Sequence, residues 1–453
     1  MNTHVKNERD GVLSILLFVH EEGGFLDEGI ERVLSAGKVC SDGPQAWTDH
    51  EKRLIRRLAK GTIERQFWLD AQIDLVSDPP VFKMKPAVRD ILRMSVYSLY
   101  FMEQIPARAV VNEAVELAKL RAPKELSGFV NGVLRQIVRK MESEESADAA
   151  KLTDTSLQGK TVGSKQWIKG AETLYCVPKW IIRLWLDDYG AEKTIQILEG
   201  VRPGMKRRLT VRPNRTKITE PGLMNLWIDH GIDCGSAGES GGVWFKSDRP
   251  VSELPGYQEG LFYIQDFGSI LAGDLAPAKS EDQVLDLCAA PGGKATQLAE
   301  RAGHVLACDL HESKLPLMRE NAERLGLTNM DFMAADATDF NPAWKGEWDV
   351  VLADVPCSGL GVIGHKPDIK LRLKKEDIGE LVELQRAILE NAVRYVKPGG
   401  YLVYSTCTVC RDENDRQIEN LLEEHPQWQL MEMKQLFPSS NSDGFFMALL
   451  HKE

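Results

Sequence analysis

Long apolar runs are missing from this chain of 453 residues. A membrane-spanning helix needs roughly 18 or more consecutive apolar residues, and no stretch of the sequence approaches that length. The first ten residues are polar and lack the apolar centre of a secretory signal peptide. These absences argue against a membrane or exported protein, and we expect the chain to work in the cytoplasm without membrane contact.

Cysteine is sparse as well. The eight cysteines are scattered along the chain, which argues against the disulfide framework of a small secreted domain. One Cys-x-x-Cys pair occurs, Cys407 and Cys410, and it supplies only two of the four ligands of a closed zinc site. We therefore expect no structural metal.

An excess of positive charge is also absent, because the net charge is −11. This excludes a purely electrostatic nucleic-acid binder, so any such contact must use local patches. Residues 1–140 hold 21 Lys/Arg against 19 Asp/Glu. Two clusters are candidates for RNA contact, although a solvated helix face explains the first equally well. They are Lys52, Arg53, Arg56, Arg57 and Lys60 in the first, and Arg208 and Arg212 within a basic run in the second.

The periodicity divides the chain into four parts. Apolar residues recur at helical spacing across residues 11–141, so 1–141 is expected to be an all-α domain. Residues 142–165 are polar and predict a linker. Residues 166–275 mix two helices and two short strands in a small α/β segment, and 276–453 form an α/β domain. The expected elements of the middle segment are helices at 180–189 and 222–230 and strands at 208–212 and 242–246.

Strands and helices alternate in the last part. This alternation predicts a parallel, doubly wound, Rossmann-like sheet, with helices at 313–325 and 375–395. A final apolar run at 445–450 is expected to form an edge strand. The predicted parallel strands are 284–287, 305–308, 330–333, 350–353 and 401–404.

Two familiar glycine motifs are absent. The turn after the first strand is Cys288-Ala289-Ala290-Pro291-Gly292-Gly293-Lys294, which matches neither the dinucleotide fingerprint nor the phosphate loop of ATPases. Glycines still let the backbone approach a ligand. Asp309 ends the next strand, where an acid commonly binds ribose hydroxyls. These residues favour a nucleoside ligand without a pyrophosphate, with Asp336 placed to bind its base; a simple tight turn is the alternative.

Two cysteines follow the fourth and fifth strands. Cys357 comes after Asp354-Val-Pro, and Cys407 after Tyr-Ser-Thr. Ligands of open α/β sheets bind beyond the carboxyl ends of the strands, so both sulfurs are expected beside the nucleoside. A thiolate is a suitable nucleophile for carbon 6 of a pyrimidine. The alternative is that both cysteines are buried and inert. Two cysteines at adjacent strand ends make this alternative the weaker interpretation.

The spelling of these motifs resembles one family closely. Residues 288–294, 354–363, 366–370 and 404–407 are similar to the RsmB (Sun) family of bacterial 16S ribosomal RNA cytosine-C5 methyltransferases. The helical start resembles the antitermination factor NusB, through residues 105–119 and 129–135, and that family carries such a domain. The resemblance covers the chain from about residue 10 to its end.

The resemblance implies a function. The chain would methylate carbon 5 of a cytosine in 16S ribosomal RNA, at a cytosine-967 type of site, with S-adenosylmethionine as methyl donor. Cys407 would attack carbon 6, Cys357 would assist release, and Asp354 would hold the base edge. RNA is the expected partner, with no obligate protein partner evident. The residues implied at the cofactor are Cys288, Ala289, Ala290, Pro291, Gly292, Gly293, Lys294, Asp309, Asp336 and Asp354; Lys366 and Lys370 join the candidate RNA contacts.

Several positions depart from the family pattern. Thr408 stands where Ser is usual, Leu371 where Trp is common, and Ala295 where Thr is usual, while Gly364-His365 replaces a more basic pair. Cys410 is an additional cysteine that we interpret as having no catalytic part. These departures bear on the RNA contacts rather than on the chemistry.

Three other functions remain to be weighed. A transfer-RNA cytosine-C5 methyltransferase of the same superfamily is disfavoured by the NusB-like start. A non-enzymatic RNA-binding or transcription-coupled protein is disfavoured by the intact Asp354, Cys357 and Cys407. A nicotinamide oxidoreductase is disfavoured by the spelling of the turn at 288–294.

Overall fold

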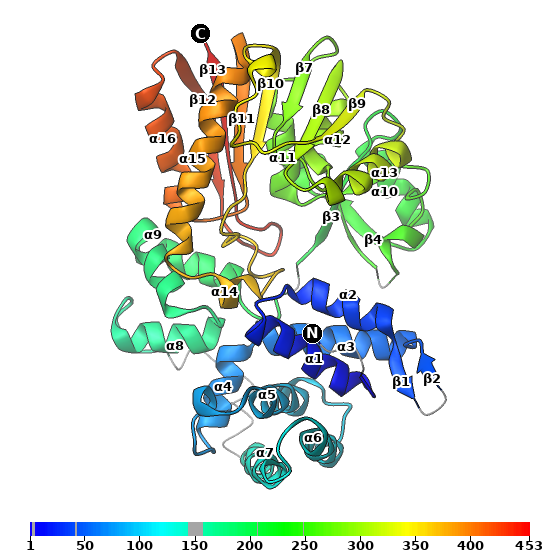
Figure 1. Cartoon of the computed structure of the whole chain (residues 1–453), viewed down its shortest axis with the longest axis vertical. Helices are drawn as coiled ribbons and strands as arrows, with labels where there is room; N and C mark the ends of the chain where they lie inside the picture. Colours follow the sequence, from blue (N-terminus) through cyan, green and yellow to red (C-terminus); the bar gives the residue numbers. More distant parts are fainter. Residues whose placement is uncertain (2–4, 41–42, 144–156, 206, 248) are drawn as a thin grey trace. The chain divides into compact units, whose positions relative to one another are not determined.

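The computed structural model describes residues 1, 5–40, 43–143, 157–205, 207–247 and 249–453 (Figure 1). The chain forms two compact units. The helical unit comprises Met1–Thr194 and Ile363–Arg372, and the sheet unit comprises Ile195–Val362 and Leu373–Glu453. The division at Thr194 lies inside the predicted middle segment. Part of the predicted linker, residues 144–156, is outside the described residues.

The helical unit is built around one apolar core. Its buried side chains come from amphipathic helices, as the periodicity predicts. Helix α3 begins with a capping box, in which Thr48 and Glu51 each bind the other's backbone N–H. The helices are α1 (Glu8–Glu21), α2 (Leu26–Ala36), α3 (Asp49–Glu64), α4 (Gln66–Asp74), α5 (Pro86–Phe101), α6 (Ala107–Arg121), α7 (Leu126–Glu142), α8 (Lys165–Tyr175), the first part of α9 (Lys179–Gly200) and α14 (Ile369–Arg372).

A short hairpin interrupts the predicted all-α region. Strands β1 (Lys38–Cys40) and β2 (Gly43–Gln45) pair antiparallel between α2 and α3. The expectation that no strand occurs in residues 11–141 is therefore wrong at this point. The hairpin has only three residues in each strand, so the architecture of the unit remains helical.

Residues 363–372 belong to the helical unit although their chain neighbours on both sides lie in the sheet unit. The Lys370 ammonium is 4% exposed and donates to the Glu64 carbonyl at 2.9 Å. Burial lowers the pKa of Lys370. The Asp368 carboxylate accepts from the Leu26 N–H at 3.3 Å. Lys370 is thus engaged inside the protein, which corrects its assignment as an RNA contact, whereas Lys366 is exposed.

The sheet unit contains a four-stranded antiparallel sheet of order β4-β5-β3-β6. One of its faces packs against helix α10 (Glu220–Asp229), with Trp227 buried between Phe245 and Phe262. The strands are β3 (Leu209–Pro213), β4 (Asp233–Ser236), β5 (Val243–Lys246) and β6 (Phe262–Ile264). Two of the four were predicted; β4, with the sequence Asp-Cys-Gly-Ser, has no large apolar residue, and β6 has only three residues.

A seven-stranded sheet of order β12-β13-β11-β10-β7-β8-β9 forms the rest of the unit. The five adjacent strands from β11 to β9 in this order are parallel, as predicted. Strands β13 and β12 pair antiparallel at the other end of the sheet. The strands are β7 (Gln283–Asp286), β8 (His304–Asp309), β9 (Met330–Ala334), β10 (Trp348–Asp354), β11 (Val396–Thr406), β12 (Trp428–Leu436) and β13 (Phe445–Lys452).

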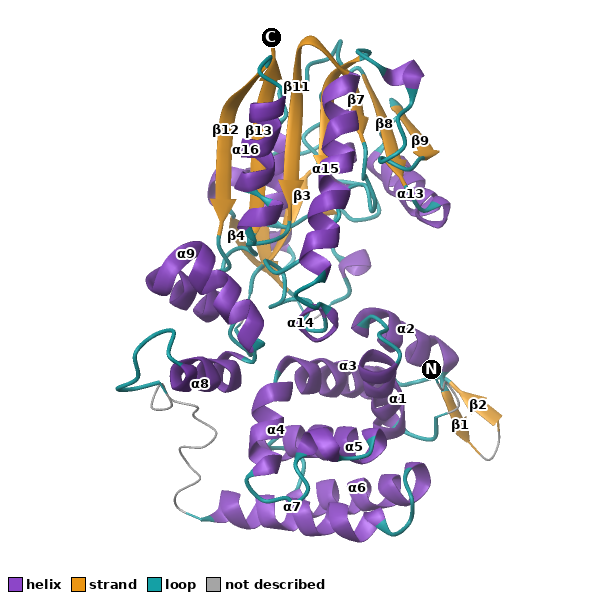
Figure 2. Cartoon of the chain, turned by 60° about the vertical axis from the view of Figure 1, so that its left-hand side comes forward, coloured by secondary structure: helices purple, strands orange, loops and turns teal. Residues whose placement is uncertain are grey.

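The alternation of side chains along each strand builds two cores. In β10, Val351 and Ala353 pack with helices α15 (Asp377–Tyr395) and α16 (Asp415–Glu424), which cover one face (Figure 2). Val350 and Leu352 pack on the other face with α12 (Gly293–Ala299) and α13 (Leu315–Leu325). A parallel sheet buried on both faces needs such continuous apolar strands. Helix α11 (Phe267–Leu275) also contacts β13.

One expectation about the sheet edge is wrong. The run at 445–450 is not an edge strand, because β13 lies between β11 and β12. The actual edge, β12, exposes Leu430, Met431 and Met433 and therefore lacks the clean alternation of a half-buried strand.

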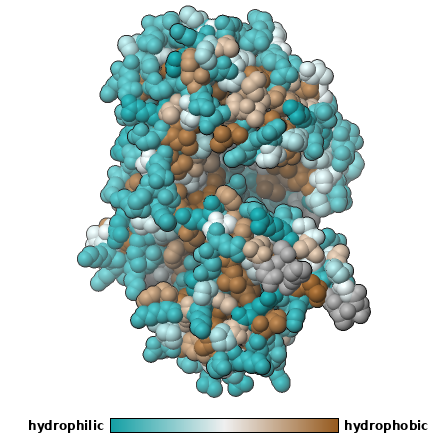
Figure 3. Space-filling model, in the orientation of Figure 1, coloured by the Kyte–Doolittle hydropathy of each residue, from teal (hydrophilic) through white to brown (hydrophobic). Residues whose placement is uncertain are grey.

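Within the described residues, no helix combines the length and the apolarity that crossing a membrane requires. Hydrophilic side chains predominate on the face drawn in Figure 3.

Candidate active site

The order of the parallel strands reverses beside β7. The chain continues from β7 to β8 on one side of the sheet and from β10 to β11 on the other. The loops after β7 and β10 therefore run in opposite directions from the carboxyl ends of these neighbouring strands. Such a switch point is where open α/β sheets bind ligands. The predicted turn at 288–294 follows β7, and Asp354 ends β10, so both lie at this point.

The turn after β7 is fixed by backbone contacts. The Ala289 N–H donates to the Cys308 carbonyl at 2.7 Å, and the Ala290 N–H donates to the Asp309 carboxylate at 3.3 Å. Gly292 has a φ of +103°, in a region that side chains rarely adopt, so a glycine is required there. The turn is therefore a preformed loop at the sheet edge, with Asp309 held against it.

The two acids predicted at the ligand differ in their surroundings. Asp309 is 6% exposed, accepts from the His311 N–H at 3.0 Å and pairs with Lys314 at 3.1 Å. Asp336 is exposed and is held by the N–H and hydroxyl of Thr338, whose hydrogen bonds lower the pKa of Asp336. Asp309 is thus part of the turn's framework, whereas Asp336 is free to meet a ligand at the end of β9.

Three carboxylates surround the turn. Asp286 is 1% exposed, and burial, followed by the charges of neighbours that include Asp354 and Asp309, raises its pKa to about 7. Asp354 accepts from Lys294 at 2.6 Å and from the Ser405 hydroxyl at 2.7 Å. Lys294 and Lys314 offset the charges of Asp354 and Asp309, so the turn offers carboxylate oxygens that accept hydrogen bonds rather than a strongly negative field.

Cys357 and Cys407 meet beyond the ends of β10 and β11. Their sulfurs lie 3.4 Å apart, and both residues are partly exposed. The hydrogen bond with Cys407, together with burial, raises the pKa of the Cys357 thiol well above its usual value. Either sulfur can donate in this contact, so the geometry brings two thiols together at the strand ends without deciding which of them is the nucleophile.

A buried polar network ties the two cysteine loops together. The Ser358 and Thr408 hydroxyls hydrogen-bond at 2.7 Å, and the Glu413 carboxylate accepts from the Ser358 N–H at 2.8 Å and from Gln385 at 3.0 Å. Burial raises the pKa of Glu413. A satisfied network of this kind holds neighbouring groups rigidly. Thr408, which departs from the family pattern, thus supplies a hydroxyl to this network.

Sequence reasoning missed Ser358 and Glu413. A signal was present, because a hydroxyl residue directly follows each of the two cysteines. Gly361 was also missed: its N–H donates to the Cys407 carbonyl at 3.1 Å, and a Cβ there would lie 2.2 Å from the Gly444 carbonyl oxygen. Cys410 is fully buried, as an inert cysteine would be.

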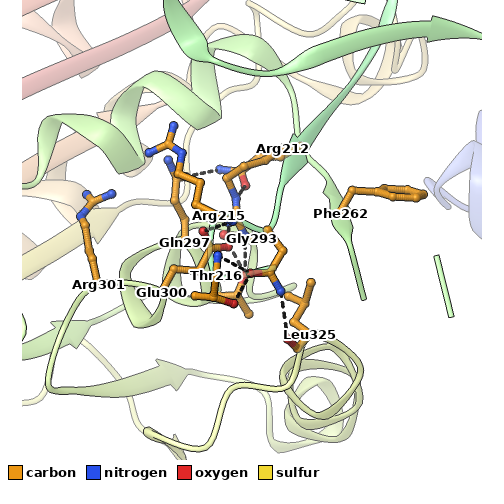
Figure 4. A network of polar contacts seen from close by, with 12 residues as sticks. Arg212, Arg215, Thr216, Phe262, Gly293, Gln297, Glu300, Arg301 and Leu325 are labelled. Carbon is orange, nitrogen blue, oxygen red and sulfur yellow. Dashed lines mark hydrogen bonds and ion pairs between the residues drawn. The ribbon is translucent and has the colours of Figure 1, made fainter. Parts of the chain in front are cut away.

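Arg212, predicted as an RNA contact, has a different place. It is 0% exposed, donates to Gln265 at 2.9 Å and Thr296 at 3.1 Å, and pairs with Glu300 (Figure 4). Burial lowers its pKa to about 9. The prediction was wrong because a carboxylate 88 residues away in sequence neutralises the guanidinium. Arg212 instead joins β3 to α12, the helix that continues the turn.

Replacing Arg212 by Met is expected to lower the free energy of unfolding by about 3–5 kcal/mol, because Glu300 is left buried without its partner. Arg208→Met is the matched control, since Arg208 is exposed, and should cost about 1 kcal/mol or less. Urea unfolding followed by circular dichroism compares the two. Equal losses for both variants would contradict the assignment of Arg212 as a buried clamp.

The other candidate RNA contacts lie at the surface of the helical unit. Arg53, Arg56, Arg57 and Lys60 are exposed on α3, and Lys52 is half-buried. Arg56 pairs with Glu31 at 3.0 Å, and Arg57 donates to the Phe101 carbonyl at 2.8 Å. The spacing puts these cations on one face of α3. That this face contacts RNA stays a prediction.

Comparison with known proteins decides the family. A family model described as 16S rRNA methyltransferase RsmB/F matches residues 273–451, and one described as NusB family matches residues 9–139. A probable ribosomal RNA small subunit methyltransferase B from Bacillus subtilis is 34% identical over 429 residues, which cover 93% of this chain and 89% of that protein. The chain belongs to the RsmB/F family.

Further relatives agree with membership of the RsmB/F family. Ribosomal RNA small subunit methyltransferase B of Proteus mirabilis is 30% identical, over 94% of this chain and 96% of that protein. A crystal structure of a methyltransferase homolog from Pyrococcus horikoshii is 25% identical, with a TM-score of 0.55, over 62% of this chain and 98% of that one. A second solved structure, at 22% identity and a TM-score of 0.75, covers 98% of both chains and shows the fold.

As a member of the RsmB/F family, the protein is an S-adenosylmethionine-dependent RNA methyltransferase. Its turn fits this cofactor. The buried Asp309 lies where a ribose is bound in related sheets. S-adenosylmethionine supplies an electrophilic methyl group when it is bound.

Proposed function

We propose that this RsmB/F protein methylates carbon 5 of a cytosine in 16S ribosomal RNA through a covalent bond from Cys407 to carbon 6. The observation that carries the proposal is the 3.4 Å approach of the Cys357 and Cys407 sulfurs beside Asp354. Covalent catalysis needs one nucleophilic sulfur, so a second thiol held against it must have a different role. Assistance in the release of the covalent intermediate is such a role.

The steps follow from the atoms present. The Cys407 thiolate bonds to carbon 6, and its electron pair makes carbon 5 nucleophilic. Carbon 5 would take the methyl group as the methyl–sulfur bond of S-adenosylmethionine breaks and leaves the thioether S-adenosylhomocysteine, and a base would then remove the carbon 5 proton. The electron pair of that C–H bond restores the ring double bond, and the bond from sulfur to carbon 6 breaks. Cys407 leaves as a thiolate, which a hydrogen bond from the protonated Cys357 stabilises.

In this mechanism Asp354 holds the cytosine edge. Lys294 and Ser405 fix its carboxylate from two sides, yet 31% of the side chain stays exposed. A carboxylate accepts a hydrogen bond from the exocyclic amine of cytosine and so orients the ring. The target base must leave its stack to reach this position.

The ribosomal substrate rests on the family and its relatives, whose names refer to the small-subunit RNA. The NusB-like helical unit favours it over transfer RNA. Methylation assays with a 16S transcript and with transfer RNA, each carrying cytosine labelled at carbon 5 with tritium, test both chemistry and substrate. Release of tritium from the 16S transcript is expected. Methyl transfer without tritium release would overturn carbon 5 as the target.

Asp309→Ala is expected to weaken S-adenosylmethionine binding by about 1–3 kcal/mol, because a buried carboxylate that meets the ribose is lost. Asp331→Ala is the matched control, since this exposed acid on β9 pairs only with His304 among the described residues. Isothermal titration calorimetry measures both. Unchanged affinity in Asp309→Ala would show that the ribose lies elsewhere.

A further inference from the structure

A pocket of about 310 Å³ lies in the sheet unit, outside the site described above. It opens beside the face of the four-stranded sheet that α10 does not cover. Its lining combines two aromatic rings, one guanidinium and several neutral polar groups, from Arg208, Thr210, Ser236, Trp244, Phe267 and Asn441. Glu239 also lines it and is paired with Lys434 at 2.7 Å.

Trp244 and Arg208 form a stacked pair at this pocket. The Arg208 guanidinium lies 4.3 Å from the centre of the Trp244 ring. The indole also lies against Gly235 on β4, where a Cβ would come within 2.8 Å of the ring. Because Gly235 has no side chain, the Trp244 indole can lie over β4.

Arg208 differs from the arginines around it. Arg207, Arg212 and Arg215 each pair with a carboxylate, namely Asp443, Glu300 and Asp274. Within the part of the chain that the structure describes, no carboxylate pairs with Arg208. An exposed cation over an indole, with no partner charge of its own, is a platform for a nucleic-acid base and its phosphate.

A short series of packed residues joins the pocket to the active site. Phe267 begins α11, and the next residue, Gly268, lies against Phe445, where a Cβ would come within 2.6 Å. The Lys294 ammonium lies 5.1 Å from the Phe445 ring, and Lys294 pairs with Asp354. The pocket is therefore a near neighbour of the proposed cytosine site.

We propose that this pocket binds an unpaired base of the substrate RNA near the target cytosine, stacked on Trp244 and Arg208. This inference rests on the proposed function. Extrusion of a base removes a stacking partner from its neighbours, and aromatic rings and guanidinium planes replace that partner in RNA complexes. The Asn441 amide and the Thr210 and Ser236 hydroxyls supply groups that hydrogen-bond the edge of such a base.

The test combines variants of the protein with an abasic scan of the RNA. Each unpaired nucleotide around the target cytosine of a 16S fragment is replaced in turn by an abasic one. For the wild type, one position should raise KM about tenfold with kcat little changed, as expected for loss of one stacked base. Trp244→Ala should raise KM by a similar factor on intact RNA and add no further penalty on that abasic RNA.

Matched variants separate stacking from folding. Trp244→Phe keeps an aromatic ring and should retain most of the affinity, while Arg208→Ala should lose part of it. Arg319→Ala is the control, because Arg319 on α13 is another exposed arginine that lies over an aromatic ring, that of Phe332. It should leave KM unchanged. Independent, multiplying penalties from Trp244→Ala and every abasic position would overturn the pocket's assignment.

Failure of the pocket and failure of the proposed function give different results. If the wild type methylated no cytosine, the same RNAs would be compared by fluorescence anisotropy, which needs no reaction. Weaker binding of intact RNA by Trp244→Ala, with no further loss at one abasic position, would still support the pocket. Equal binding by wild type and Trp244→Ala would overturn it.

Discussion

Cys407→Ala is expected to lower the rate of methyl transfer by roughly 10⁴-fold or more while leaving S-adenosylmethionine binding intact. Loss of the nucleophile removes the covalent route itself, whereas loss of a hydrogen bond removes only part of a stabilisation. The sulfur lies at the end of β11, separate from the turn after β7, so the cofactor contacts should persist. Single-turnover methyl transfer and calorimetric titration with the cofactor measure the two properties.

Cys410→Ala is the matched control for this variant. Cys410 lies three residues from Cys407 and is fully buried, outside the pair of facing sulfurs. Its replacement should leave the rate of methyl transfer close to that of the wild type. A loss as large as that of Cys407→Ala would contradict the division of roles among the three cysteines.

The second large effect is expected from Cys357→Ala. In the proposed mechanism a hydrogen bond from Cys357 assists the departure of the Cys407 sulfur, so removal of Cys357 should trap the protein on the RNA. The trapped adduct should survive a denaturing gel and should need both RNA and S-adenosylmethionine to form fully. Turnover should stop after about one event per protein molecule.

The reverse pattern would reassign the two thiols. If Cys407→Ala accumulated an adduct and Cys357→Ala did not, Cys357 would be the nucleophile. Ser358→Ala gives a useful comparison, because it loosens the loop without removing a thiol. It should lower the rate without trapping RNA.

Four of the five parallel strands, β7, β8, β10 and β11, were predictable because each contains a buried apolar run that ends in a polar residue. Val284, Val305 and Val350 begin such runs, and both faces of the sheet are covered, so the pattern is strong. The positions of Asp309, Asp354, Cys357 and Cys407 followed from that topology. Their meeting beyond neighbouring strand ends is confirmed for the two cysteines by the contact between their sulfurs.

Other features depend on contacts between distant parts of the sequence. Arg212 looked like a surface cation because its partner Glu300 lies in another element, and Lys370 looked the same although Glu64 receives its ammonium. The Ser358–Glu413 network is also invisible to periodicity, since its members are 55 residues apart. A charged residue in a sequence is expected at the surface unless the fold buries it together with a carboxylate or carbonyl that offsets its charge.

The central claim is carbon-5 methylation of one 16S cytosine by Cys407, and bisulfite sequencing tests it most directly. The 16S RNA of a deletion strain is compared with that of strains restored with the wild-type chain or with Cys407→Ala. One cytosine should resist deamination with the wild type and become fully convertible in the deletion strain and with Cys407→Ala. An identical conversion profile in all three strains would contradict the account.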